Sequence, residues 1–260
     1  MDLKHLDRDD VVRIYDHLVE EFSTSEDPIA PAGIKDENLL ISAVNRQWVG
    51  GYGNLKYTTP VQCAATLAYG ICKNHCFYNG NKRTALVGML AHLDRNKLSV
   101  WGLSQDDLYD FMLAVADNRV TPFVEGGIPA SGTKASSDSE VDAMARYLGA
   151  HSYAIVRGEQ RITYKDLRKI LRRYGYDLGE KKNSFISIVR ITGGGPVNFD
   201  RIIYPGENRD VEISAIKRVR EKCRLREEDG VDSEAFYFDY IPLDDFVNKY
   251  RIVLRRLGQT

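Results

Sequence analysis

Two apolar helical segments joined by a short polar loop constrain the fold of this 260-residue chain more than any other feature. The first, residues 59–74, begins with Thr59 and Pro60, which are typical of a helix N-terminus. It is apolar on almost every side, so we expect it to lie inside a core. The second, residues 81–96, has a broad apolar face. These segments contribute the candidate core residues Val61, Ala64, Ala65, Leu67, Ala68 and Ile71, and Leu86, Val87, Met89, Leu90 and Leu93.

The rest of the N-terminal half also has helical spacing. The pattern predicts further helices over 7–22 (with Asp7 as its cap), 36–46, 104–117 and 138–150. Residues 118–139 carry Pro, Gly and Ser without periodicity, which predicts a long loop. We therefore predict an all-α domain over residues 1–150.

Residues 151–260 have a different, mixed pattern. A basic amphipathic helix is predicted over 163–174, and β-branched residues predict strands over 184–192 and 201–204. Two more helices are predicted over 210–226 and 242–257. We therefore predict that a smaller α+β domain, residues 151–260, follows the helical one.

Charge is distributed unevenly between the two halves. Residues 1–150 contain 14 Lys and Arg against 20 Asp and Glu, a net charge of −6. Residues 151–260 contain 22 Lys and Arg against 17 Asp and Glu, a net charge of +5. The basic second half permits a nucleic-acid or acidic partner. Cations at 165, 168, 169, 172, 173, 181 and 182 could contact phosphates, although a solvated helix face is the more common explanation for such residues.

Membrane segments and disulfides are not expected. No apolar run approaches the roughly 20 residues that span a bilayer, and the charged N-terminus lacks a signal core. These features predict a cytoplasmic protein with no membrane partner. Three of the four cysteines, Cys63, Cys72, Cys76 and Cys223, fall in or beside apolar helical sequence, so we expect reduced, mostly buried thiols.

The loop between the apolar helices carries the chemistry. It reads His-Cys-Phe-Tyr-Asn-Gly-Asn-Lys-Arg-Thr over residues 75–84. Free N–H groups at a helix N-terminus bind anions, but Lys82 and Arg83 are unfavourable there unless an anion compensates them. A phosphate chain would do so, and an imidazole such as that of His75 is a common general base near neutral pH. The alternative is an ordinary loop histidine beside solvated cations.

This run resembles the Fic motif, His-x-Phe-x-Asp/Glu-Gly-Asn-Gly/Lys-Arg, and departs from it only at Asn79. Lys82 stands where many Fic enzymes have Gly and resembles the Doc (death-on-curing) branch. Residues 33–40, 73–75 and 114–116 also resemble that branch. The resemblance covers about residues 1–150 and implies the helical Fic/Doc fold.

The resemblance implies a toxin-like transferase that uses ATP or another NTP, with Mg²⁺, to modify a hydroxyl of a target protein. His75 would deprotonate the hydroxyl, Gly80 and Asn81 would form an anion cradle with Lys82, and Arg83 would hold the distal phosphates. Phe77 would pack inward and fix the loop. Lys82 favours Doc-like phosphorylation over AMP transfer. A translation factor as target and a small antitoxin as partner are further implications.

Asn79 replaces the acid that helps hold Mg²⁺ in the family, keeping an oxygen ligand but losing the charge. Turnover at a reduced level is one interpretation. The other is a catalytically degenerate scaffold that binds a nucleotide, a nucleic acid or another protein.

Two further segments resemble family features. Residues 46–58 occupy the position of the flap that pairs with the target by strand addition, unless they are an ordinary surface loop. Residues 121–126 fit the inhibitory pattern Ser/Thr-x-x-x-Glu-Gly/Asn, in which Glu125 would pair with Arg83; an ordinary loop is the alternative.

The second half loosely resembles the double-stranded-RNA-binding-like fold of HicA-type toxins, through its helix, strands and closing helix. The histidine expected near the strand is absent, with Asn183 and Ser184 in its place, so ribonuclease activity is not inferred. Nucleic-acid binding and partner recognition both remain open for this half.

Overall fold

The computed structural model describes residues 3–51, 53–126, 136–155, 161–231, 233–237 and 243–260. The chain divides into two compact units: residues 1–155 with 241–260, and residues 156–240. The second unit is therefore inserted in sequence between two parts of the first. This differs from the predicted boundary at 150/151, which placed residues 241–260 in the C-terminal domain.

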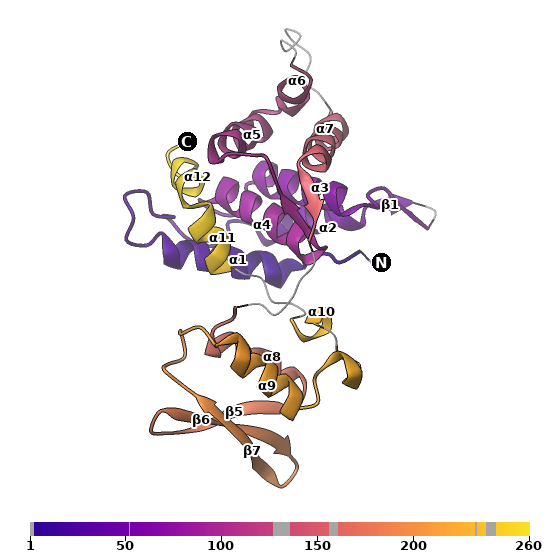
Figure 1. Ribbon diagram of the computed structural model, residues 1–260. Coiled ribbons are helices and arrows are strands. Elements are labelled where there is room, and N and C mark those ends of the chain that lie inside the picture. The colour runs from indigo at the N-terminus through magenta and orange to yellow at the C-terminus, as the bar shows by residue number, and fades with distance from the viewer. Residues whose placement is uncertain (1–2, 52, 127–135, 156–160, 232, 238–242) are drawn as a thin grey trace. The chain divides into compact units, whose positions relative to one another are not determined.

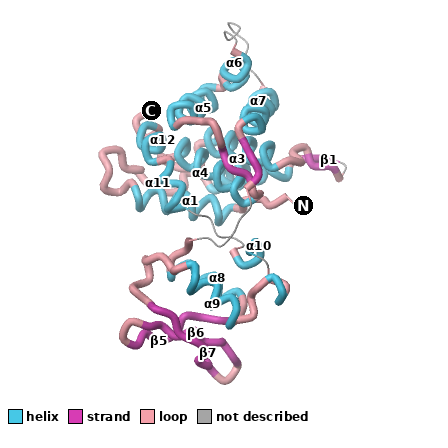
Figure 2. The backbone as a smooth tube through the Cα atoms, in the orientation of Figure 1, coloured by secondary structure: helices cyan, strands magenta, loops and turns pink. Residues whose placement is uncertain are grey.

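Helices build most of the first unit (Figures 1 and 2). They are α1 (Arg8–Glu21), α2 (Glu37–Asn45), α3 (Pro60–Asn74), α4 (Asn81–Arg95), α5 (Gln105–Asp117), α6 (Val120–Glu125), α7 (Ser137–Ala150), α11 (Leu243–Lys249) and α12 (Arg251–Arg256). A short hairpin of β1 (Gly50–Gly51) and β2 (Asn54–Leu55) and a pair of β3 (Leu98–Val100) and β4 (Ser152–Ala154) complete it. None of the described helices is long and apolar enough to cross a membrane.

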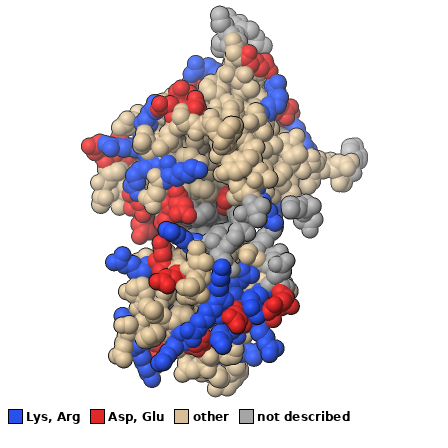
Figure 3. Space-filling view, viewed as in Figure 1, with Lys and Arg blue, Asp and Glu red and all other residues tan. Residues whose placement is uncertain are grey.

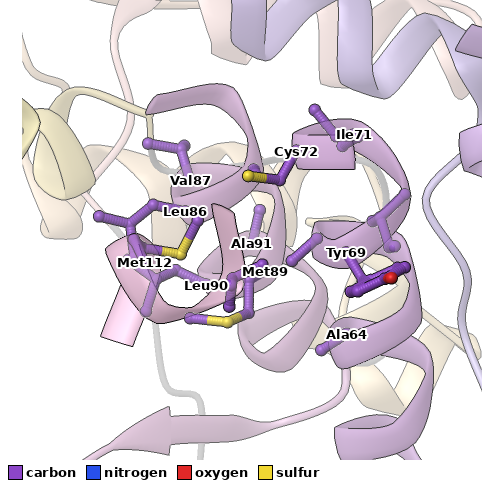
Figure 4. Packing of buried hydrophobic residues seen from close by; sticks show 14 of the residues in the cluster. Ala64, Tyr69, Ile71, Cys72, Leu86, Val87, Met89, Leu90, Ala91 and Met112 are labelled. Atoms are coloured by element: carbon purple, nitrogen blue, oxygen red, sulfur yellow. The ribbon is translucent and has the colours of Figure 1, made fainter. Parts of the chain in front are cut away.

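Helices α3 and α4 form the centre of the core, as the sequence predicts. Side chains of α3, including Ile71 and Cys72, lie against Leu86, Leu90 and their neighbours on α4 (Figure 4). Every residue from Thr84 to Leu93 is buried. The four cysteines are buried free thiols, which confirms the prediction made for them.

The N-terminus of α3 is fixed by a reciprocal cap. Thr59 Oγ1 accepts a hydrogen bond from Gln62 N at 3.3 Å, and Gln62 Oε1 accepts one from Thr59 N at 3.1 Å. Pro60 at the first helical position needs no hydrogen-bond partner for its nitrogen.

We expect Thr59→Ala to lower the free energy of unfolding by about 1 kcal/mol, the usual effect of removing a cap. Urea denaturation would measure this loss. Thr58→Ala is the matched control, because it removes a neighbouring hydroxyl and leaves the cap in place. Equal stabilities of the two variants would contradict the role given to Thr59.

Two parts of the first unit differ from the sequence prediction. The predicted loop 118–139 contains α6, and residues 127–135 of it lie outside the described residues. The carboxylate of Glu140, on α7, accepts hydrogen bonds from Val120 N at 2.9 Å and Thr121 N at 3.3 Å. Because this cap comes from a later helix, the local sequence gives no sign of it. The β3–β4 pair was also not predicted.

The second unit is an α+β fold. Its elements are α8 (Tyr164–Arg173), β5 (Tyr176–Lys182), β6 (Phe185–Thr192), β7 (Gly195–Ile203), α9 (Ile213–Lys222) and α10 (Ser233–Phe236). The strands form one antiparallel sheet in the order β5-β6-β7, with a core that includes Leu167, Ile188 and Ile216. The strand over 184–192 is confirmed. The strand predicted over 201–204 is the end of the longer β7, and the helix predicted over 242–257 is divided into α11 and α12 of the first unit.

Candidate active site

The loop between α3 and α4 begins at His75, which ends α3 in the left-handed conformation (φ 50°, ψ 48°). This backbone conformation turns the chain sharply out of the helix. His75 itself is exposed, whereas the next two residues, Cys76 and Phe77, are buried. The one imidazole of the loop is therefore presented to solvent on a rigid helix end.

Phe77 anchors the loop, as predicted from the resemblance. Its ring stacks on Tyr15 of α1, with centroids 3.9 Å apart and an interplanar angle of 4°. The Asn81 side chain holds the Phe77 backbone from the other side, since Oδ1 accepts from Phe77 N at 3.0 Å and Nδ2 donates to Phe77 O at 2.8 Å. The Asn81 side chain therefore holds the loop in place. Only the backbone N–H of Asn81 is left for the anion-binding role that was predicted for this residue.

Gly80 starts α4 in a positive-φ conformation (φ 83°), and an added Cβ would lie 3.0 Å from Ile29. No side chain caps this helix start. The first backbone bond back to the cap is donated by Thr84 N to Gly80 O. The N–H groups of the three preceding residues are therefore those that a helix N-terminus offers to an anion.

Arg83 is buried with its charge incompletely paired. It is 1% exposed. Nη1 donates to the carbonyl oxygen of Asp27 at 2.9 Å, and the guanidinium lies over the Phe22 ring, 5.3 Å from its centroid. Nε and Nη2 have no hydrogen-bond partner among the described residues. Burial lowers the pKa of Arg83, with the Asp27 charge acting in the opposite sense. Such a group is expected to bind an anion, because buried donors without partners are costly.

Lys82 lies at the same helix start but has a partner. Its Nζ donates to the main-chain oxygen of Thr260 at 2.6 Å and to Thr260 Oγ1 at 3.0 Å. Asp27 accepts a hydrogen bond from Gln259 Nε2 on its carboxylate at 2.9 Å. Residues 258–260 are thus part of this site, and the sequence prediction missed them because no local pattern connects them to the loop.

Asn79 does not fit the metal-binding role predicted for it. Its Oδ1 accepts from Gly80 N at 2.6 Å, and its Nδ2 donates to Ala30 O at 2.9 Å. Residues 75–84 contain no carboxylate, and Mg²⁺ in nucleotide sites is usually held by one or two carboxylates. The loop fits the phosphates of a nucleotide better than it fits Mg²⁺.

Glu125 does not contact Arg83. It lies at the end of α6, where its carboxylate accepts a hydrogen bond from Arg146 of α7 at 2.9 Å. Both side chains are more than half exposed. The predicted pairing of Glu125 with Arg83 is therefore wrong for this structure, because α6 packs on α7. The predicted loop at this position is likewise a short helix.

The predicted flap, residues 46–58, includes the β1–β2 hairpin, whose strands are exposed.

In the second unit, Lys and Arg gather on the face that carries α8 and α9 (Figure 3). Several of these cations are paired: Arg168 and Arg172 both contact Asp177, and Lys169 lies 3.8 Å from Asp166. The predicted phosphate contacts of this face stay a prediction.

Comparison with known proteins agrees with the geometry of the loop. No curated protein matches the chain. Residues 5–93 match the profile described as the Fic/DOC family, a range that runs from the segment before α1 almost to the end of α4 and includes the whole loop. The N-terminal part of this chain, residues 5–93, is therefore similar to the Fic/DOC family.

Proposed function

We propose that this protein is a Fic/Doc-type transferase that moves a phosphorus-containing group from ATP, or another NTP, onto a hydroxyl of a target protein. One observation carries the proposal: a buried Arg83 with two unpaired donors lies in the first turn of the helix that follows the exposed His75. One group can bind phosphate, and the other can accept a proton.

In this reaction the nucleotide supplies the group to be transferred. Arg83 would bind phosphate oxygens through its free donors, helped by the N–H groups at the start of α4. His75 would accept the proton of the target hydroxyl as its oxygen bonds to phosphorus, and the bond from phosphorus to the leaving phosphate oxygen would break. The proton would finish on the imidazole and the electron pair on the leaving group.

Phosphate transfer is favoured over AMP transfer because Lys82 resembles the Doc branch. The experiment is label transfer in a cell lysate with Mg²⁺ and ATP labelled on either the α or the γ phosphate. Label from the γ position on one target band supports Doc-like phosphorylation, and label from the α position shows AMP transfer. If neither label is transferred, the transferase proposal fails for ATP.

A second function, nucleotide binding without turnover, is favoured by Asn79 alone. The Asn79 amide is used within the loop, and it lacks the charge that would help a divalent metal. A degenerate domain would still bind triphosphate through Arg83. Calorimetry that detects nucleotide binding, with no label transferred, would support this reading.

The two functions are separated by Asn79→Asp. If the site is a weakened transferase, the new carboxylate should raise Mg²⁺-dependent transfer roughly tenfold, which corresponds to about 1.4 kcal/mol of the barrier. Initial rates with Mg²⁺ and with EDTA would measure this. Asn79→Ala is the control, because it also loses the bond to Ala30 without adding charge. Equal rates in the two variants would argue against a metal-assisted reaction at this position.

A further inference from the structure

We propose that His5, Cys63 and His92 form a binding site for a late first-row transition-metal ion such as Zn²⁺, which joins the segment before α1 to the two central helices. This inference goes beyond the proposed transferase reaction and does not depend on it. The three side chains lie at the ends of α3 and α4 opposite to the loop 75–84, and the proposed reaction does not use them.

The three groups come together from separate parts of the chain. One nitrogen of each imidazole and the sulfur of Cys63 all lie within 4.8 Å of one another. Cys63 is in the first turn of α3, and His92 is in the last turn of α4. Imidazole and thiolate are ligands that Zn²⁺ uses in proteins, at about 2.0–2.3 Å from the ion. Ligand atoms of such a tetrahedral ion lie roughly 3.5 Å apart, so the most distant pair would have to approach by about 1 Å.

Both imidazoles carry a buried nitrogen that no hydrogen bond satisfies. His92 is 0% exposed, and its Nε2 has no partner among the described residues. The buried Nδ1 of His5 also has none there. A buried polar atom of this kind is costly unless a ligand satisfies it. Two such nitrogens beside a thiol therefore indicate a metal ion as the ligand.

The protonation states of the imidazoles suit a metal ion. Burial lowers the pKa of His92 to about 3, and the charges of His5 and Arg95 act in the same direction. Burial also lowers the pKa of His5, against an opposing effect of the Gln47 side chain. Both rings are therefore neutral at neutral pH, and a neutral imidazole is the form that binds a metal ion.

The Cys63 thiol keeps its proton until a metal ion replaces it. Burial raises the pKa of this thiol to about 11, and Sγ contacts the carbonyl oxygen of Tyr57 at 3.6 Å. On binding, the S–H bond breaks, its proton passes to solvent and its electron pair forms the bond from sulfur to the metal. The ion gives up water ligands to the three side chains and keeps one water as its fourth ligand.

Contacts around the group hold the ligands in position. Arg95 Nη1 donates to the main-chain oxygen of His5 at 3.0 Å, and the His5 ring lies against Trp48, with centroids 4.7 Å apart. Asn96 Nδ2 lies 3.4 Å from His92 Nδ1. This contact is longer than an ordinary hydrogen bond, so little is lost when the ring hydrogen moves to Nδ1 and Nε2 binds the ion. His5 is half-buried, and the ion would enter from its side.

The test uses the full protein, reduced and freed of metal with a chelator. Zn²⁺ is titrated in competition with a chelating indicator, and Co²⁺ is titrated while the near-ultraviolet absorption of cobalt–thiolate bonds is recorded. We expect Zn²⁺ to bind with a Kd of about 1 μM or below. Co²⁺ should give the thiolate absorption. The Tm should rise by about 5 °C when free Zn²⁺ is about 100 times Kd.

Two pairs of variants assign the ligands. Cys63→Ala should abolish the cobalt–thiolate absorption, whereas Cys72→Ala, which removes another buried thiol of α3, should keep it. His5→Gln should weaken binding of both ions by about 100-fold, and it changes a half-buried residue outside the helices, which provides a second test if Cys63→Ala fails to fold. His17→Gln is its matched control, because the group of potential ligands around His17 contains no thiol.

The outcomes decide the inference in either direction. Thiolate absorption that depends on Cys63 and weakens in His5→Gln, but not in His17→Gln, supports the site. Zn²⁺ binding without any cobalt–thiolate absorption would place the ion elsewhere, for example near His17, and overturns the inference. Absorption that persists in Cys63→Ala, or equal affinities of His5→Gln and His17→Gln, overturns it as well.

Discussion

Replacing His75 by Asn is expected to lower label transfer by about 10²–10⁴-fold, the usual contribution of a general acid–base group. His75 is the imidazole of the loop and stands exposed at the end of α3. The Kd for nucleotide should stay the same, because phosphate binding is assigned to Arg83 and the start of α4. Initial rates of label transfer and calorimetry of the same preparation would measure both quantities.

Asn is the variant of choice because of the backbone. His75 has φ 50° and ψ 48°, and Asn adopts this left-handed region more easily than Ala does. His75→Ala would add backbone strain to the loss of the imidazole, so a fall in rate would have two causes. If His75→Asn transfers label at the rate of the intact protein, His75 is not the base.

The helical core of the first unit could be predicted because its signals are local. Thr59, Pro60 and the apolar run that follows specify α3 and its start without reference to the rest of the chain. The loop could also be recognised, since the residues of its motif are contiguous. The family resemblance implied that Phe77 packs inward, and in the structure its ring stacks on Tyr15.

The features of the fold and of the site that could not be predicted depend on contacts between residues far apart in the sequence. Helix α6 forms where the sequence suggested a loop, because Glu140 caps it from α7. Residues 258–260 reach the loop because the chain returns to the first unit after an insertion at 156–240. Propensity and periodicity carry no information about such returns, so the contacts of residues 258–260 with the loop could not be predicted.

The environment of Arg83 leads to a second prediction with a large effect. The Arg83→Met variant should bind triphosphate about 100-fold more weakly than the unchanged protein, and it should be more stable against unfolding. Two unpaired donors of a buried guanidinium destabilise the resting protein. Met has a similar length, places its sulfur near the Phe22 ring and leaves no buried donor. We expect the free energy of unfolding to rise by about 1–2 kcal/mol, because apolar replacement of buried charge is often stabilising.

Arg95→Met is the matched control for this stability change. Arg95 is also on α4, but its Nη1 forms an ion pair with Asp10 at 2.5 Å, and Asp10 is 2% exposed. Burial raises the pKa of Asp10, but the hydrogen bonds and charge of Arg95 hold it below its usual value. Removing Arg95 leaves this buried carboxylate with only the half-exposed Arg13 and the backbone N–H of Asp7 as partners, and should cost about 3 kcal/mol.

Urea denaturation of both variants without nucleotide would show the opposite signs. A stability loss in Arg83→Met as large as that in Arg95→Met would mean that Arg83 is a structural cation. The unpaired donors would then have no connection with phosphate. A gain in stability combined with lost binding would instead show that this position carries a destabilising group for the sake of its ligand, as expected where function and stability conflict.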